Sequence, residues 1–205
     1  MCLFTSFLKN PLSVNLERIG IKRLRLLQRN YKAEDLFDFK KYWFMKTAII
    51  YLSKYGTTKK VAGMIGTRVT DGEVTMIDLN EDQSPDLSFY DRIIVGASVY
   101  TGTAKKKFKE FLTVNHVSLF AVREVGLFLC GMEPDSIKQQ EEMDRSFPEE
   151  LLRHSKVREF MGGELLLEKM NFIDRFVVKK MMKTTVSVSN INEEAIDHFV
   201  EKMLS

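Results

Sequence analysis

The sequence predicts an α/β protein built on a doubly wound parallel sheet with helices on both faces. From residue 45 onward, short apolar runs alternate with segments of helical spacing, which is the pattern of successive strand–helix units. The clearest runs are apolar throughout, as in strands that are buried on both faces. Of the 205 residues, 44% are hydrophobic and 29% are charged, which is typical of a globular chain and excludes a disordered one.

Five strands are expected, and the first is the clearest. It reads Thr-Ala-Ile-Ile-Tyr-Leu, a continuous apolar run that ends at Ser53. The fifth follows the pair Gly162-Gly163 and reads Glu-Leu-Leu-Leu. The predicted strands are residues 47–52, 73–79, 92–97, 124–130 and 164–167.

The segments between and after these strands are predicted to be helices. The first, residues 56–69, places an apolar stripe on one face, as a helix covering a sheet does. Residues 104–114 turn apolar side chains inward and a run of lysines outward. The remaining predicted helices are residues 134–145, 148–154, 171–183 and 192–204.

Residues 1–44 differ from the rest of the chain. They carry nine Lys/Arg and four Asp/Glu, a balance of +5, whereas the other 161 residues have a balance of −2. Their apolar residues precede their basic ones, which is not the order of a secretory signal peptide. We expect them to be a poorly ordered extension, or the product of a start upstream of Met45, and we place the folded domain at residues 45–205. The near-neutral domain predicts no nucleic-acid partner.

The rest of the composition narrows the class further. No apolar run approaches the ~18–20 residues that span a bilayer. Cys2 and Cys130 form neither a disulfide framework nor a zinc motif, so a cytoplasmic location is expected. The three histidines are scattered, and we expect no metal site.

The loops that follow strands one, three and four are the candidate binding site, because open α/β sheets bind ligands at the carboxyl ends of their strands. The first loop is rich in hydroxyl groups and opens a helix, whose unpaired N–H groups suit a terminal phosphate. It contains neither a P-loop nor a dinucleotide motif. The alternative is that Ser53 and Thr57 only cap the helix. The candidate residues of this loop are Ser53, Tyr55, Gly56, Thr57 and Thr58.

The second and third loops are expected to hold the flat part of a ligand. An aromatic ring at the end of a buried strand can stack on such a ligand, although an ordinary turn with a half-exposed Tyr would look the same. In the third loop Gly131 permits close backbone approach, and the thiol of Cys130 is expected to be a small buried group and not a nucleophile. The candidates are Ala97, Ser98, Val99, Tyr100, Thr101 and Gly102, and then Cys130, Gly131 and Met132.

These loops resemble those of the flavodoxins. Residues 48–58 resemble the flavodoxin phosphate loop, T-x-T-G-x-T, with Ser53 at the first Thr and Tyr55 at the second. The second and third loops fall where flavodoxins hold the flavin ring. The resemblance covers residues 45–205, and it implies non-covalently bound FMN on a flavodoxin-like five-stranded sheet of order 2-1-3-4-5.

Three blocks are similar to the flavodoxin-type protoporphyrinogen oxidases: residues 90–98, residues 108–111 and above all residues 171–183. This similarity implies stepwise oxidation of a porphyrinogen in heme biosynthesis, with a quinone accepting electrons at the inner face of the membrane. Two segments depart from the subfamily. The second loop reads Gly-Ala-Ser-Val-Tyr-Thr-Gly where the subfamily usually has G-A-S-I-R-Y-G, and residues 133–150 are acidic where the subfamily has a basic insertion.

The helix at residues 171–183 bears on the choice between an enzyme and an electron carrier. Met170, Ile173, Val177 and Met181 form one stripe, while Phe172, Phe176, Val178 and Met182 fall outside it, so the apolar surface is wider than one packing contact needs. Three lysines near its end suit an anionic lipid surface.

We therefore favour an FMN-dependent oxidoreductase that touches the membrane through residues 170–183. One alternative is a flavodoxin-type electron carrier, although such carriers are usually strongly acidic and this domain is not. Another is an FMN-bound regulatory or structural protein. Packing of this helix on two sides, within the domain or in a dimer, would explain the same pattern. No residue is assigned a catalytic role.

Overall fold

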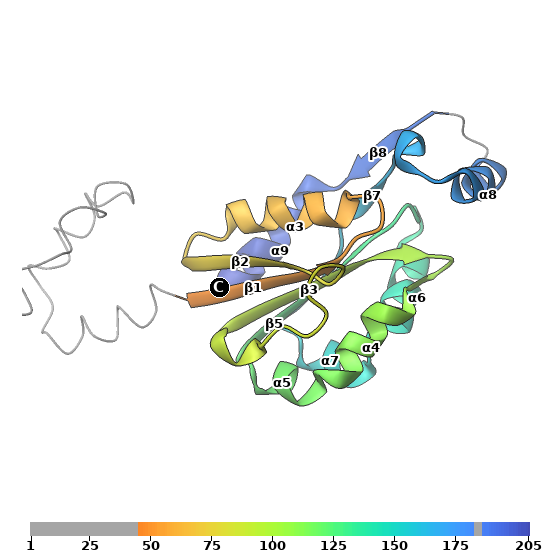
Figure 1. Cartoon of the computed structure of the whole chain (residues 1–205). Helices are drawn as coiled ribbons and strands as arrows, with labels where there is room; N and C mark the ends of the chain where they lie inside the picture. The colour runs from red at the N-terminus through yellow and green to blue at the C-terminus, as the bar shows by residue number, and fades with distance from the viewer. Residues whose placement is uncertain (1–44, 183–185) are drawn as a thin grey trace, which may run out of the picture. The chain divides into compact units, whose positions relative to one another are not determined.

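The computed structural model describes residues 45–182 and 186–205, and its core is one parallel sheet (Figure 1). The parallel strands lie in the order β2-β1-β3-β5-β6, which confirms the predicted order 2-1-3-4-5 when the parallel strands alone are counted. A short strand β4 pairs antiparallel with the end of β3. The strands are β1 (Met45–Leu52), β2 (Gly72–Asp78), β3 (Arg92–Tyr100), β4 (Thr103–Ala104), β5 (Glu124–Cys130) and β6 (Val157–Phe160).

The fifth parallel strand is not the segment predicted from the sequence. It is β6, which pairs with β5 from Gly126↔Val157 to Leu129↔Phe160. Residues 164–167 belong instead to β7 (Gly162–Leu165) and the turn after it, and β7 pairs antiparallel with β8 (Val188–Ile191) in a separate two-stranded sheet. The prediction failed because β6 is an edge strand with charged residues at Arg158 and Glu159, and edge strands commonly carry such residues.

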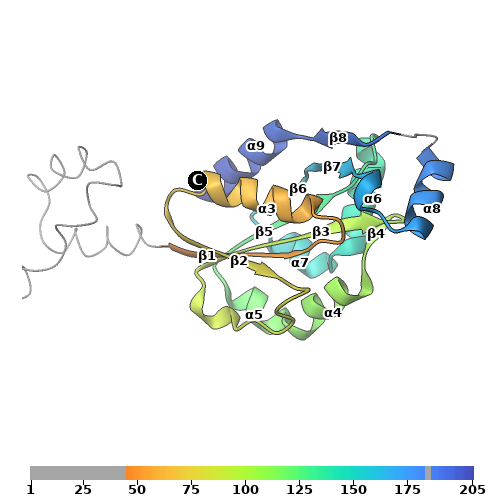
Figure 2. The same cartoon turned by 45° about the horizontal axis from the view of Figure 1, so that its top comes forward.

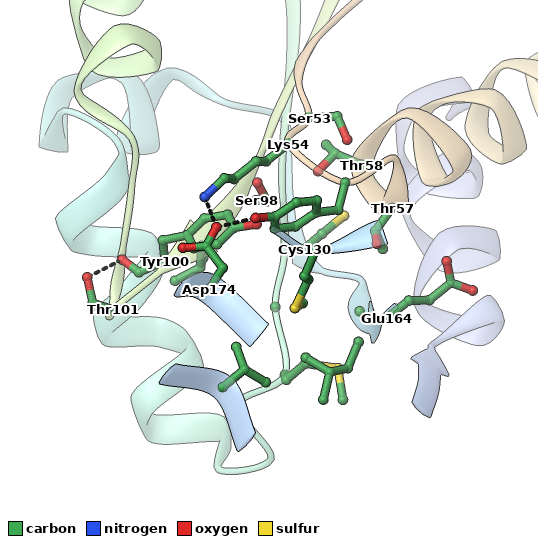
Figure 3. A pocket seen from close by; sticks show the side chains of 18 residues that line it. Ser53, Lys54, Thr57, Thr58, Ser98, Tyr100, Thr101, Cys130, Glu164 and Asp174 are labelled. Atoms are coloured by element: carbon green, nitrogen blue, oxygen red, sulfur yellow. Dashed lines mark hydrogen bonds and ion pairs between the residues drawn. The ribbon is translucent and has the colours of Figure 1, made fainter. Parts of the chain in front are cut away.

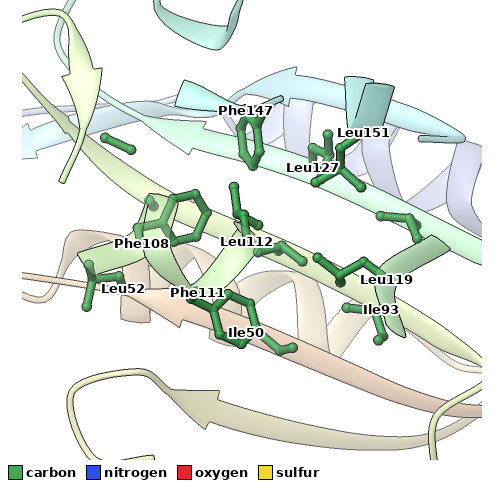
Figure 4. Packing of buried hydrophobic residues seen from close by; sticks show 14 of the residues in the cluster. Ile50, Leu52, Ile93, Phe108, Phe111, Leu112, Leu119, Leu127, Phe147 and Leu151 are labelled. Carbon is green, nitrogen blue, oxygen red and sulfur yellow. The ribbon is translucent and has the colours of Figure 1, made fainter. Parts of the chain in front are cut away.

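The helices cover both faces of the sheet, as predicted. On one face α3 (Thr57–Arg68) and α9 (Glu193–Leu204) pack on Ile49, Ile94 and Phe128. The other face is covered by α4 (Lys106–Val114), α5 (His116–Ala121), α6 (Ser136–Ser146) and α7 (Glu149–His154). Figure 4 shows this second cluster, in which Phe111 of α4 lies over Ile50 and Leu119 of α5 lies beside Ile93. Because neighbouring residues of β1 point into opposite clusters, the strand is apolar from Ala48 to Leu52.

A buried arginine ties three segments together at the amino ends of the strands. The Arg92 side chain is 3% exposed, and its guanidinium donates to both carboxylate oxygens of Asp71, at 2.8 and 2.9 Å. Its Nε donates to Glu124 at 2.8 Å. The start of β3 is thereby joined to the start of β5 and to the turn before β2.

The segment after β6 forms an additional layer beyond the carboxyl ends of the strands. It contains β7, a 3-10 turn (Leu167–Lys169), α8 (Phe172–Met182) and β8. Figures 1 and 2 both place α8 at this end of the sheet. The expectations for residues 1–44 and for Lys183 lie outside the described residues. In the described part, no helix has the length and apolar character needed to cross a bilayer.

Candidate functional site

A cavity of about 290 Å³ opens at the carboxyl ends of β1, β3 and β5, and it brings the three predicted loops together (Figure 3). The first loop contributes Ser53, Lys54, Tyr55, Thr57 and Thr58 to its wall. The second contributes residues 98–101, and the third contributes residues 130–132. A fourth wall, which the sequence did not predict, consists of Gly163, Glu164, Leu165, Met170, Asp174 and Val178.

Three of the predicted site residues do not line this cavity. Ala97 is 1% exposed within the hydrophobic core, and it belongs to β3, which continues to Tyr100. Gly56 and Gly102 lie in the backbone turns beside the wall, with φ values of 99° and 83°. Contact of all fourteen residues with a cofactor stays a prediction.

The first loop ends in a helix N-terminus that lacks a side-chain cap. Gly56 adopts the left-handed conformation at the N-cap of α3, and no side chain caps the first N–H groups of that helix. Ser53 Oγ accepts a hydrogen bond from the Gly56 N–H at 3.1 Å, so Ser53 shapes the loop without capping α3. The free N–H groups and the positive end of the helix dipole make this an anion site.

The hydroxyl of Thr58 is the second feature that points to a ligand. Thr58 is fully buried, and its Oγ1 has no hydrogen-bond partner among the described residues. The Cys130 thiol lies beside it, but a thiol is only a weak hydrogen-bonding group. Leaving a buried hydroxyl unpaired costs about 1–3 kcal/mol, so a bound anion that accepts this hydrogen bond would remove the cost. A phosphate group fits these donors.

Two tyrosines flank the middle of the cavity. The rings of Tyr55 and Tyr100 lie 6.4 Å apart at 57°, and Lys54 Nζ lies about equally far from both, at 5.0 and 5.1 Å from their centroids. Burial, with the nearby charge of Asp174, raises the pKa of Tyr100, so its hydroxyl stays protonated. Aromatic rings in this position provide stacking surfaces for a flat ligand.

The fourth wall is held to the first loop by Asp174 of α8. The Asp174 carboxylate accepts hydrogen bonds from Lys54 Nζ, as Figure 3 shows, and from the Tyr55 hydroxyl. Asn171 Nδ2 also donates to it, at 3.2 Å. Hydrogen bonds from Lys54 and Tyr55 hold the pKa of Asp174 below its usual range, so the carboxylate is ionised at neutral pH. No local sequence pattern indicates this contact, because it joins residues that are 119 and 120 positions apart.

Strand β7 reaches the third loop because Gly163 allows a close approach. A Cβ at this position would lie 2.7 Å from the carbonyl oxygen of Gly131, which is too close for any other residue. Beside it Glu164 pairs with Lys60 at 2.6 Å. Burial alone would raise the pKa of Glu164, but hydrogen bonds from Lys60 and Ser189 outweigh it and lower the pKa. The negative charge near the phosphate loop is therefore compensated.

Nothing in the cavity is a ready nucleophile or metal site. Burial raises the pKa of the Cys130 thiol to about 12, so it is uncharged at neutral pH and unreactive. In the part of the chain that the structure describes, no cluster of His, Cys, Asp and Glu has the geometry to hold a metal ion.

Helix α8 exposes apolar side chains beside the cavity. Phe172 is 84% exposed, Ile173 is 73% exposed and Phe176 is 63% exposed. Of the apolar stripe named from the sequence, Met170 is buried and Ile173 is exposed. The helix faces the cavity through Asp174 and Val178, and Asp174 is bound to the first loop. The side chains of Val177, Lys179, Lys180, Met181 and Met182 lie outside the described residues.

The cavity lies at the carboxyl ends of the strands, beside the switch point of the strand order, which is where the class of doubly wound α/β proteins binds its ligands. The family model described as a flavodoxin domain matches residues 48–191, and the chain belongs to this family. The resemblance to the flavodoxins is thereby confirmed.

Individual relatives are distant. The chain is 22% identical over 160 residues to the protoporphyrinogen IX dehydrogenase (quinone) of Escherichia coli strain K12, covering 74% of this chain and 87% of the relative. A short-chain flavodoxin associated with a PDU bacterial microcompartment matches at 13% identity and a TM-score of 0.48, over 78% of this chain and 97% of that one. A flavoprotein in complex with FMN from Lactobacillus acidophilus matches at 20% identity and a TM-score of 0.38, over 58% and 91% of the two chains.

Proposed function

We propose that the protein is an FMN-dependent oxidoreductase that oxidises protoporphyrinogen IX and passes the electrons to a quinone. The observation that carries the cofactor assignment is the unpartnered, buried hydroxyl of Thr58 at an uncapped helix N-terminus. Membership of the flavodoxin domain family and the 22% identity to a protoporphyrinogen IX dehydrogenase support the assignment.

The residues of the cavity would have three roles. Ser53, Thr57, Thr58 and the N–H groups of α3 would bind the phosphate of FMN. Tyr55 and Tyr100 would flank its ring, and the buried wall around Cys130 would exclude water. When bound, FMN would accept the electrons that the substrate loses. The side chains that line the cavity cannot accept them.

The exposed apolar side of α8 favours an enzyme with an apolar substrate over a carrier that meets only protein partners. Phe172, Ile173 and Phe176 belong to the same helix that lines the cavity through Asp174 and Val178. An apolar surface at the rim suits a quinone or a porphyrinogen arriving from a lipid surface. We propose that this helix contacts the membrane peripherally.

This proposal predicts the effect of replacing Phe172, Ile173 and Phe176 together by serine. Because all three side chains are exposed, the FMN content and the melting temperature should change little. Oxidation of protoporphyrinogen in the presence of a quinone should fall about tenfold or more, and so should binding to vesicles of anionic lipid. The physical reason is that serine offers less apolar surface to bury against lipid or substrate, and each Å² of apolar surface removed from water contributes ~25 cal/mol.

The matched control replaces by serine three exposed apolar residues that precede the amino ends of β3 and β5, namely Phe89, Val114 and Val117, which are 66%, 81% and 78% exposed. This control should leave both the oxidation of protoporphyrinogen and the binding to vesicles unchanged. If the α8 variant carries FMN, binds vesicles and turns over like the wild type, the membrane-facing enzyme is wrong and the carrier becomes the better explanation.

A further inference from the structure

The rim of the cavity around Tyr100 carries two ammonium groups. Lys54 Nζ lies 5.1 Å from the centroid of the Tyr100 ring, and Lys105 Nζ lies 5.5 Å from it. Lys54 is paired with Asp174. Lys105 is half-buried, and among the described residues no carboxylate forms an ion pair with it. One carboxylate therefore faces two cations at this rim.

The surroundings of Lys105 increase the positive field. Burial lowers the pKa of Lys105, and the charges of Lys54 and Lys107 lower it further, while Asp174 alone opposes them. Lys105 is also the N-cap of α4, whose first turn contains no acidic residue. Cations at the positive end of a helix are unfavourable, so the contact with the Tyr100 ring is the favourable interaction that the structure shows for this ammonium group.

A third cation approaches the same turn from α6. A Cβ on Gly102 would lie 3.7 Å from the guanidinium of Arg145, whose ion pair with Glu141 is a long one, at 3.3 Å. Figure 3 shows Tyr100, Thr101 and Lys54 on the same side of the cavity. The turn after β3 is thus surrounded by basic groups from three parts of the chain.

We infer that Lys105, together with Lys54, forms a carboxylate-binding position at the rim of the cavity, and that the substrate is a flat molecule that carries ionised carboxylates. This inference rests on the proposed function and makes it more specific, because a neutral quinone would not use these cations. Both ammonium groups lie close to the centroid of the Tyr100 ring, at 5.1 and 5.5 Å, and this ring lines a cavity of about 290 Å³. They therefore suit a carboxylate on a small planar molecule better than an extended acidic protein surface. A charge-assisted hydrogen bond from an ammonium group gives such a position its strength.

The test is equilibrium binding to the FMN-loaded protein, without turnover. The probes are protoporphyrin IX, a planar dicarboxylic acid that is already oxidised, and its uncharged dimethyl ester, both in the same neutral detergent and followed by the change in flavin fluorescence. The wild type should bind the acid more tightly than the ester. Lys105→Ala should weaken binding of the acid about tenfold and leave binding of the ester unchanged. Lys105→Glu should weaken binding of the acid further. The preference for the acid should shrink as salt rises from 0.05 to 0.5 M, because salt screens a half-exposed charge.

Lys106→Ala is the matched control, since Lys106 is the next residue but its side chain is 90% exposed. It should bind both probes as the wild type does. An equal preference of the wild type for acid and ester, unchanged binding in Lys105→Ala, or an equal loss in Lys106→Ala would each overturn the inference. Turnover of protoporphyrinogen is measured separately. If the dicarboxylate binds through Lys105 but is never turned over in its reduced form, the proposed function fails and the carboxylate site stands.

Discussion

Gly56→Val is expected to weaken FMN binding by about 2–3 kcal/mol, or roughly 30- to 150-fold. Gly56 has a φ of 99°, where a β-branched residue is strongly strained. The strain would be relieved by rotating the peptide groups that open α3, and these groups provide the N–H donors of the phosphate site. The cause is the backbone conformation and not lack of space, because a Cβ at this position would meet only Lys169 Nζ, at 3.9 Å.

Gly56→Asn is the matched control for this prediction. Asparagine tolerates the left-handed region better than most residues, so this variant should bind FMN within about tenfold of the wild type. Both variants are compared by titrating apoprotein with FMN and following flavin fluorescence, after circular dichroism has shown that they are folded. Equal and unchanged affinity in both variants would mean that the first loop does not hold the phosphate.

Arg92→Met should lower the free energy of unfolding by about 3–5 kcal/mol. Its guanidinium is almost fully buried and makes three hydrogen bonds to Asp71 and Glu124. Methionine would leave the partly buried carboxylate of Asp71 without this partner, and it would leave Glu124 with only its longer contact to Lys156, at 3.3 Å. Combining it with Asp71→Asn and Glu124→Gln should recover part of the loss, because the unpaired charges are then gone.

The control is Arg153→Met, which breaks an exposed pair with Glu149 whose side chains are 67% and 79% exposed. Such surface pairs contribute about 0–1 kcal/mol, so this variant should unfold almost as the wild type does. Urea denaturation gives the free energy of unfolding of the wild type, of the two single variants and of the combined triple variant. A loss below ~1 kcal/mol for Arg92→Met would show that the buried ion pairs contribute little to the stability of the fold.

Sequence patterns predicted the parts of this fold that are governed by local periodicity. The runs at β1, β3 and β5 are apolar because both faces of these strands are buried, and a single sequence displays that directly. Strand β6 was missed because an edge strand needs less apolar surface and tolerates charge. The segment at β7 was misassigned because an apolar run does not reveal which strand it will pair with.

The candidate site also has a part that the sequence predicts and a part that it does not. The loops at the strand ends were predictable, because the ends of parallel strands meet at one edge of the sheet. Asp174 was not, since its contact with Lys54 and Tyr55 depends on how the chain returns after β7. Nor could the orientation of α8 be predicted, because its apolar residues occupy more than one face and only the tertiary contact selects the face that turns toward the cavity.

The central claim is that the first loop holds the phosphate of FMN, and the most direct test compares the affinities of the apoprotein for FMN and for riboflavin, which lacks the phosphate. We expect FMN to bind the wild type much more tightly than riboflavin does. In Thr58→Val this difference should narrow by about 1.5–3 kcal/mol, while the apoprotein should be no less stable, because the substitution removes a buried hydroxyl that has no partner. Equal affinities of the wild type for FMN and riboflavin would contradict the account.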